Sequence, residues 1–159
     1  MSTHPMIPGL REPVPARLLR RILNLWPPYL AAGIRVEQIA TDYAYLHVSM
    51  RLRWYNRNYM GTHFGGSLYA MTDPFYALML IQQLGPGHVV WDKAASVRFR
   101  RPGTGTVQAC FQITPAELAD LKARLEAGGR ADFVKSVRVS DAAGKTVAEV
   151  EKVVYVRRR

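Results

Sequence analysis

The chain has 159 residues, of which 22 are Lys or Arg and 12 are Asp or Glu, so its formal net charge at pH 7 is +10. A chain of this length can bury one sizeable core without a structural metal, and its single Cys110 excludes a disulfide within the chain. The positive charge favours anionic partners, namely nucleic acid, acidic lipid or a phosphate-bearing small molecule, but it does not choose among them. The four histidines lack the close pair spacing of a metal site, so we predict no metal and no cofactor.

The first sixteen residues contain four prolines and no continuous apolar core. We therefore predict a flexible segment over 1–16, neither a signal peptide nor a membrane span, and a cytoplasmic protein. A single domain is predicted over 17–159. It begins with an amphipathic helix, stopped by a Pro pair at 27–28, whose apolar residues recur at helical spacing: Leu18, Leu19, Ile22, Leu23 and Trp26.

The next segments predict two strands and then one long helix. Alternating, β-branched and aromatic residues indicate strands over 34–43 and 44–55. The apolar segment 64–85 is too long for a strand, so we interpret it as a central helix that Gly85 and Pro86 terminate. Pro74 lies inside this segment and predicts either a kink in a continuous helix, which we favour, or a break.

Four further strands are predicted, over 89–100, 105–114, 131–140 and 145–156. Cys110, in the second of these strands, is interpreted as a small buried hydrophobe. Thr114, Pro115 and Glu117 have the pattern of a capping box that starts a helical insertion, which Gly128–Gly129 ends. Runs of strands without regular alternation with helices indicate the α+β class, with an antiparallel sheet wrapped around the central helix.

Residues 58–66, NYMGTHFGG, lead into the predicted central helix, and Asp73 lies inside that helix. This string and the order of elements resemble the hotdog-fold thioesterase superfamily, in particular the acyl-CoA thioesterases of the phenylacetate-pathway type. Asn58, Gly61, the pair Gly65–Gly66 and Asp73 match that type in identity and spacing, whereas Phe64 stands where the type has His. With residues 89–105 included, the chain looks most like a bacterial hotdog branch whose function is largely unassigned.

The resemblance implies a hotdog fold, an acyl-CoA substrate hydrolysed at its thioester, and a homodimer or dimer of dimers with sites shared between subunits. It also implies that the Gly66 N–H polarises the thioester carbonyl and that Asp73 is the general base or nucleophile. A helix N-terminus with unpaired N–H groups, opened by two glycines, supports the first role on physical grounds. The structural alternatives are tight packing at the glycines and capping of a second helix by Asp73.

Neighbouring residues are assigned to the same site, each with an alternative. Asn58 orients a water or the thioester oxygen, or else satisfies backbone groups of its own loop. Phe64 is predicted to line the acyl pocket beside Gly65. Thr62 supplies a hydroxyl to the substrate or, the interpretation we prefer, caps the helix.

Three arginines close to one another are the candidates for binding the nucleotide end of the substrate. Alternation places Arg98 and Arg100 on one face of their strand, and Arg101 follows. These side chains either cover a solvated face of the sheet or clamp the phosphates of coenzyme A.

Two other functions remain open at this point. One is a non-catalytic hotdog module that binds an acyl-CoA or lipid-like ligand, in which Phe64 marks lost chemistry. The other is a nucleic-acid-binding protein driven by the net charge, which we rank last because nothing in the sequence resembles a zinc finger or an RNA-recognition motif.

The spacing of Gly66 and Asp73 predicts how many chains form one site. Seven residues of continuous helix bring the two onto one face but separate them by about 10 Å along the axis. One thioester cannot touch both, because reacting atoms approach to about 3–3.5 Å. We therefore predict a two-fold dimer in which Gly66 of one chain faces Asp73 of the other.

Overall fold

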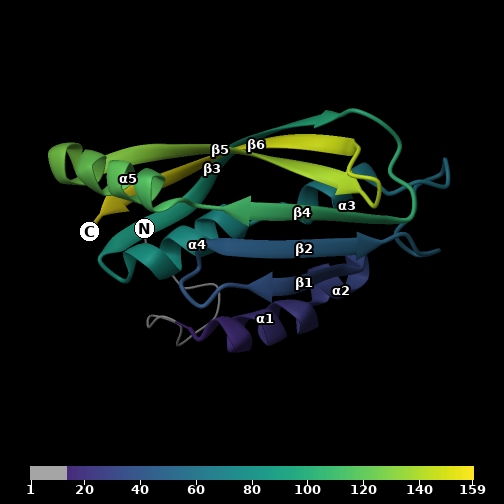
Figure 1. Cartoon of the computed structure of the whole chain (residues 1–159), viewed down its shortest axis with the longest axis horizontal. Helices are drawn as coiled ribbons and strands as arrows, with labels where there is room; N and C mark the ends of the chain where they lie inside the picture. The colour runs from purple at the N-terminus through teal and green to yellow at the C-terminus, as the bar shows by residue number, and fades with distance from the viewer. Residues whose placement is uncertain (1–13) are drawn as a thin grey trace.

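The computed structural model of this chain describes residues 14–159 (Figure 1). Its elements in chain order are α1 (Ala16–Leu25), α2 (Pro27–Ala32), β1 (Ile34–Ile39), β2 (Tyr45–Arg51), α3 (Gly65–Ala70), α4 (Phe75–Leu84), β3 (His88–Phe99), β4 (Thr106–Gln112), α5 (Pro115–Gly128), β5 (Arg130–Asp141) and β6 (Thr146–Arg158). The predicted flexible segment 1–16 lies almost wholly outside the described residues.

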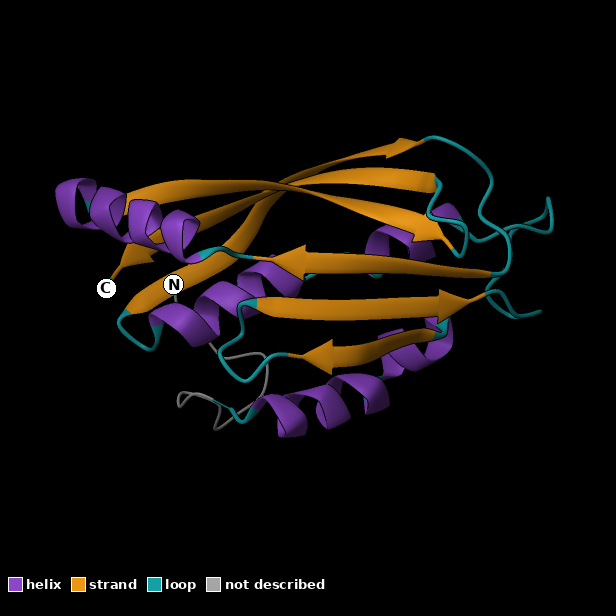
Figure 2. Cartoon of the chain, viewed as in Figure 1, coloured by secondary structure: helices purple, strands orange, loops and turns teal. Residues whose placement is uncertain are grey.

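The six strands form one antiparallel sheet in the order β1-β2-β4-β5-β6-β3. The helix α4 packs on one face of this sheet (Figure 2), where the rings of Phe75 and Tyr76 lie 5.0 and 5.2 Å from the ring of Phe111 on β4. The predicted α+β class, with an antiparallel sheet around a central helix, is confirmed. Within residues 14–159, the outer edges of β1 and β3 pair with no strand.

The central helical segment is present, but its predicted continuity is wrong. α3 ends at Ala70, residues 71–74 are not helical, and α4 begins at Phe75. Pro74 lacks the N–H that a continuous helix would use, and its ring disfavours helical backbone at Asp73. Asp73 does not cap the second helix either, because the N-cap of α4 is Pro74 and no side chain bonds to that end.

Two other predictions are corrected by the structure. The pair Pro27–Pro28 ends α1 but also begins α2, since the first N–H groups of a helix need no partner within it. Cys110 is exposed rather than buried. The alternation of β4 turns Ala109 and Phe111 into the core, so Cys110 points the other way.

The helical insertion is confirmed as α5, together with its capping box. The Thr114 hydroxyl accepts a hydrogen bond from the Glu117 N–H at 3.2 Å, and Glu117 Oε2 accepts one from the Thr114 N–H at 2.8 Å. Leu121 and Leu125 are its buried residues, and Gly129 ends it with a left-handed φ of 69°. All the groups of this capping box lie within four residues of one another.

Candidate active site

Asp73 lies in the break between α3 and α4, and its carboxylate meets a lysine from near the C-terminal end of the chain. Lys152, on β6, places Nζ 2.5 Å from Asp73 Oδ1. The Lys152 side chain is completely buried, whereas the Asp73 side chain is 41% exposed. The pair therefore joins a buried cation to a carboxylate that reaches solvent.

A second carboxylate approaches the same ammonium group. Asp92 Oδ1, on β3, lies 3.2 Å from Lys152 Nζ, which is ion-pair distance without hydrogen-bond geometry, so this oxygen accepts no hydrogen bond within residues 14–159. The Tyr69 hydroxyl lies 3.4 Å from the same Nζ. We call Asp73, Asp92 and Lys152 the charge cluster. With all three groups ionised, two carboxylates and one ammonium give it a net charge of −1.

The surroundings of the charge cluster shift the pKa of two of its members. Burial raises the pKa of Asp92; the Lys152 charge opposes this effect and the Asp73 charge adds to it. Burial lowers the pKa of Lys152, but the hydrogen bond to Asp73 and the charges of both carboxylates outweigh burial and raise that pKa overall. Lys152 is therefore a cation at neutral pH, and Asp92 takes up a proton more readily than an ordinary aspartate.

Hydrogen bonds hold the backbone of the break in place. The Tyr29 hydroxyl donates to the Asp73 carbonyl at 2.5 Å, and the Thr72 hydroxyl donates to the Tyr69 carbonyl at 2.7 Å. Burial raises the pKa of Tyr29, and the Asp73 charge adds to this, so the phenol stays a donor. The carboxylate of Asp73 is thus carried on a backbone that is fixed independently of the carboxylate itself.

Gly65 and Gly66 begin α3, and their N–H groups have no hydrogen-bond partner among the described residues. Aromatic rings lie against both glycines. A Cβ on Gly66 would overlap the ring of Phe64, and one on Gly65 would lie 3.1 Å from the ring of Phe99. Tight packing is therefore one physical reason for the pair, and it coexists with the free N–H groups.

Asn58 organises its own loop in this chain. Its Oδ1 accepts hydrogen bonds from the N–H groups of Met60 and Thr62 at 2.9 and 3.1 Å, and its Nδ2 donates to the Thr62 hydroxyl at 3.0 Å. Thr62 does not cap α3, whose N-cap is Phe64, so the helix-cap interpretation of Thr62 is wrong. The Phe64 side chain is 56% exposed, so in the single chain it does not line an enclosed pocket.

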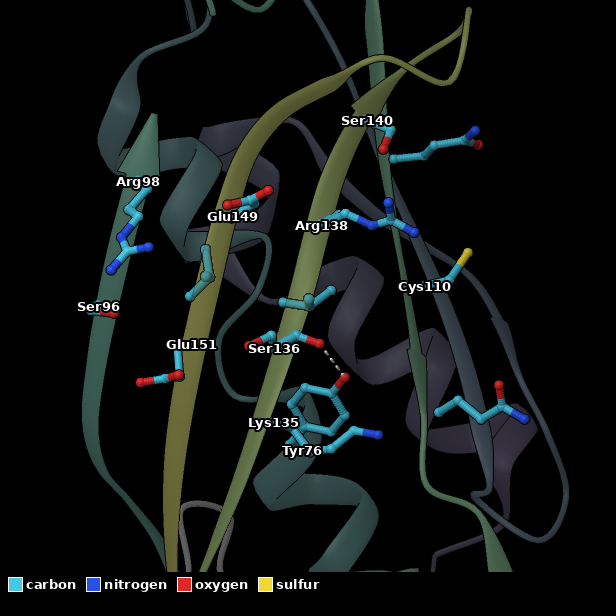
Figure 3. A pocket seen from close by; sticks show the side chains of 14 residues that line it. Tyr76, Ser96, Arg98, Cys110, Lys135, Ser136, Arg138, Ser140, Glu149 and Glu151 are labelled. Carbon is cyan, nitrogen blue, oxygen red and sulfur yellow. Dashed lines mark hydrogen bonds between the residues drawn. The ribbon is translucent and has the colours of Figure 1, made fainter. Parts of the chain in front are cut away.

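The structure does not bring the three arginines together around Asp73. Arg98 lines a cavity of about 670 Å³, which Figure 3 shows from close by. Glu149, the register partner of Arg98, is three residues from Lys152 on β6, so Arg98 and Glu149 lie on the opposite face of the sheet from Lys152. The part of the cavity that Arg98 lines therefore does not face Asp73. Arg100 pairs with Glu149 at 2.6 Å, and Arg101 makes no side-chain hydrogen bond within the described residues.

Sequence reasoning missed Lys152 and Asp92. A signal for Lys152 was present in the alternation of residues 145–156: every second residue from 148 to 156 is apolar except Lys152, which marks a charge on the buried face of a strand. No comparable pattern marks Asp92, because a β-bulge between Asp92 and Ala94 interrupts the alternation of β3.

Two further observations concern the part of the chain that the structure describes. Residues 14–159 hold no group of three or more His, Cys, Asp or Glu side chains arranged to bind a metal ion. None of the helices that they form combines the length and the apolar composition needed to span a bilayer.

A model of the family described as "Domain of unknown function (DUF4442)" matches residues 16–156. No sequence among curated proteins matches the chain. Among solved structures, a Pseudomonas aeruginosa protein of unknown function, named a probable thioesterase, is 20% identical with a TM-score of 0.83, and the match covers 94% of this chain and 99% of that one.

Two more solved structures have the same architecture. A thioesterase from Haemophilus influenzae is 13% identical with a TM-score of 0.66, covering 93% of this chain and 94% of that one. The PaaI protein of the E. coli phenylacetic acid degradation operon is 21% identical with a TM-score of 0.61, covering 90% and 91%. At these identities the likeness shows a shared fold, and the expected hotdog fold is confirmed.

Proposed function

Because this chain belongs to the DUF4442 family and shares its fold with proteins named thioesterases, we propose that it is a hydrolase that cleaves the thioester of an acyl-CoA. The observation that supports this most is the position of Asp73. Its carboxylate is held by Lys152 without capping a helix, it is 41% exposed, and it follows the free N–H of Gly66 by seven residues.

The proposed chemistry uses these groups in separate roles. The Gly66 N–H donates a hydrogen bond to the thioester oxygen and stabilises the negative charge that develops there. Asp73 removes a proton from a water molecule as the water oxygen bonds to the carbonyl carbon, or attacks that carbon itself. The carbon–sulfur bond then breaks, and the proton that Asp73 took from the water passes to the sulfur, so coenzyme A leaves as a thiol. If Asp73 itself attacks, coenzyme A leaves from a mixed anhydride on Asp73 and its sulfur takes a proton from solvent. Water then hydrolyses that anhydride, which releases the acid and regenerates the carboxylate.

The proposed active unit is a homodimer. The helical steps from Gly66 to Ala70 alone advance about 6 Å along α3, and Asp73 lies beyond the end of that helix. That separation exceeds the 3–3.5 Å or so of a reacting pair, so we assign Gly66 and Asp73 of one site to different chains. The unpaired edge of β3 and the nearby exposed rings of Phe64 and Phe99 offer a surface for the second copy.

Complementation between two inactive variants tests the shared site. Asp73→Asn removes the base, and Gly66→Pro removes the N–H donor at a helix start, where the backbone accepts proline once the exposed Phe64 ring moves away from the added Cβ. Each homodimer should be inactive. Refolding the two together at equal ratio should restore roughly a quarter of the wild-type activity, because half the dimers are mixed and each has one of two sites intact.

The matched control mixes Asp73→Asn with a chain that carries both substitutions, a combination that cannot form an intact site. Native mass spectrometry measures the fraction of mixed dimers in each sample. Mixed dimers without recovered activity would contradict the shared site.

A non-catalytic acyl-CoA-binding module is the second candidate, favoured by one observation. Phe64 stands where thioesterases of the phenylacetate-pathway type have histidine, and its ring lies directly against Gly66. It therefore adds an apolar contact where a hydrogen-bonding ring is expected. Saturable binding of acyl-CoAs of short, long and aromatic acyl groups, with no turnover of any of them, would select this candidate over hydrolysis.

A further inference from the structure

Lys152 is the only lysine or arginine among residues 14–159 that is buried, and its side chain has no exposed surface. A buried ammonium is costly unless anions balance it. Here the anions come from two separate elements: Asp73 from the break before α4 and Asp92 from the edge strand β3. The sheet and the central helix are thus joined by charge at the one place where the helix is interrupted.

The two oxygens of the Asp73 carboxylate have different surroundings. Oδ1 accepts the hydrogen bond from Lys152 at 2.5 Å, whereas Oδ2 has no donor in the described part of the chain. The side chain is partly open to solvent. Lys152 therefore fixes one oxygen and leaves the other free to act on a water molecule or a substrate.

We propose that Lys152 is a positioning residue that holds and orients the Asp73 carboxylate, and that Asp92 is the counter-charge that allows Asp73 to take up a proton. This inference rests on the proposed hydrolysis. When Asp73 removes a proton from water, it becomes neutral and the net charge of the cluster changes from −1 to 0. Asp92 then balances Lys152, so no buried ammonium is left without an anion.

The groups that face Lys152 come from every element packed around it: Asp73 in the break, Tyr69 on α3, Asp92 on β3, and the register partners Ala95 on β3 and Lys135 on β5. Lys135 has its own ion pair with Glu117, at 2.7 Å. The balance inside the cluster is therefore set by one ammonium and two carboxylates, with the Tyr69 hydroxyl beside them.

This arrangement predicts shifts of opposite sign in the pH dependence of kcat/KM. Lys152→Met leaves two carboxylates side by side, so Asp73 ionises less readily and the midpoint of the acid limb rises by roughly one pH unit or more. Asp92→Asn removes the second carboxylate, so Asp73 becomes the only anion beside the Lys152 ammonium and the midpoint of the acid limb falls by roughly the same amount. Lys152→Arg keeps the charge and should keep the midpoint close to the wild-type value.

A matched control distinguishes positioning from a general loss of charge. Lys135→Met removes a lysine from another carboxylate pair, at the register partner of Lys152 on β5, and should leave the midpoint close to wild type. Equal shifts in Lys135→Met and Lys152→Met, or shifts of the same sign in Lys152→Met and Asp92→Asn, would overturn the proposal. If Lys152→Met does not fold, Asp92→Asn decides, and an unmoved midpoint there overturns it.

Carbon-13 NMR of protein labelled at the aspartate carboxyl groups gives a readout that needs no turnover. The Asp73 signal is assigned by its loss in Asp73→Asn, and its titration midpoint should move up in Lys152→Met and down in Asp92→Asn. If the wild-type protein hydrolyses no thioester, the proposed function fails. Opposite shifts of the Asp73 titration midpoint in the two variants would still support the proposed roles of Lys152 and Asp92. A signal whose midpoint stays fixed in both variants would overturn the inference alone.

Discussion

Two lysine–carboxylate pairs in this chain contain the same charges in different surroundings. Glu117 and Lys135 lie 2.7 Å apart with 35% and 22% of their side chains exposed, and Glu117 also accepts the hydrogen bond from the Thr114 N–H. Asp73 and Lys152 lie 2.5 Å apart with the lysine completely buried, and the Asp73 carboxylate accepts no backbone hydrogen bond within residues 14–159. The Glu117 carboxylate hydrogen-bonds the backbone at the start of α5, whereas the Asp73 carboxylate makes no hydrogen bond to the start of α4.

That difference separates a structural role from a chemical one. A carboxylate that caps a helix contributes stability through local hydrogen bonds, and its removal weakens that helix start. A carboxylate held by a single buried cation, with its other oxygen free, contributes a fixed negative charge near solvent. On this reasoning the Asp73 pair should govern turnover, and the Glu117 pair should govern only stability.

The largest expected effect is on hydrolysis. Asp73→Asn should lower kcat/KM for an acyl-CoA by roughly a hundredfold or more, the usual range for loss of a general base, because an amide cannot accept the proton. Asn still offers an oxygen to Lys152, and Asp92 still balances its charge, so the variant should fold. Glu117→Gln, assayed in parallel as the control, should retain nearly full turnover. Full activity in Asp73→Asn would assign the Asp73 pair a structural role as well.

The local parts of this fold could be predicted from the sequence because their causes are local. The capping box of Thr114 and Glu117 spans four residues, and the glycine end of α5 depends only on its own backbone. Strand alternation likewise predicted the sheet. The resemblance carried by residues 58–66 and Asp73 predicted the hotdog fold, which the solved structures confirm.

The long-range parts could not be predicted because nothing near them in the chain specifies them. Lys152 is 79 residues from Asp73, and no local pattern pairs the two. Pro74 is compatible with either a kinked continuous helix or a break at residues 71–74. Which of the two forms depends on distant hydrogen bonds, such as that from Tyr29, that hold a non-helical backbone. The catalytic roles of Gly66, Asp73 and Asn58 stay predictions.

A smaller effect is expected on stability. Lys152→Met should lower the free energy of unfolding at neutral pH by about 2 kcal/mol, less than the roughly 3–5 kcal/mol of a fully buried pair because Asp73 is partly exposed. The pKa of Lys152 is raised on folding, so its contribution is complete below the pKa of an unfolded lysine, about 10.4, and is lost as the pH rises through the folded value. Denaturant unfolding of variant and wild type should therefore converge in strong alkali. A difference that is constant from neutral to alkaline pH would show that packing, not charge, accounts for the loss.

The smallest effect concerns Glu117 and has the opposite pH dependence. Burial raises the pKa of Glu117, but hydrogen bonds from Lys135 and Thr114 and the Lys135 charge outweigh burial and lower it overall. Its contribution is therefore present above the pKa of an unfolded glutamate, about 4.3, and is lost as the pH falls through the lower folded value. Gln keeps the acceptor for the Thr114 N–H but removes the charge and the second oxygen, which accepts from Lys135. Solvent screens this partly exposed pair, so Glu117→Gln should cost about 0.5 kcal/mol at neutral pH. Unfolding free energies of the variant and the wild type should then converge as the pH falls below that range, whereas the alkaline convergence expected for Lys152→Met follows the titration of the lysine itself. A difference between Glu117→Gln and the wild type that persists below that range would show that a lost contact, and not the Glu117 charge, accounts for the cost.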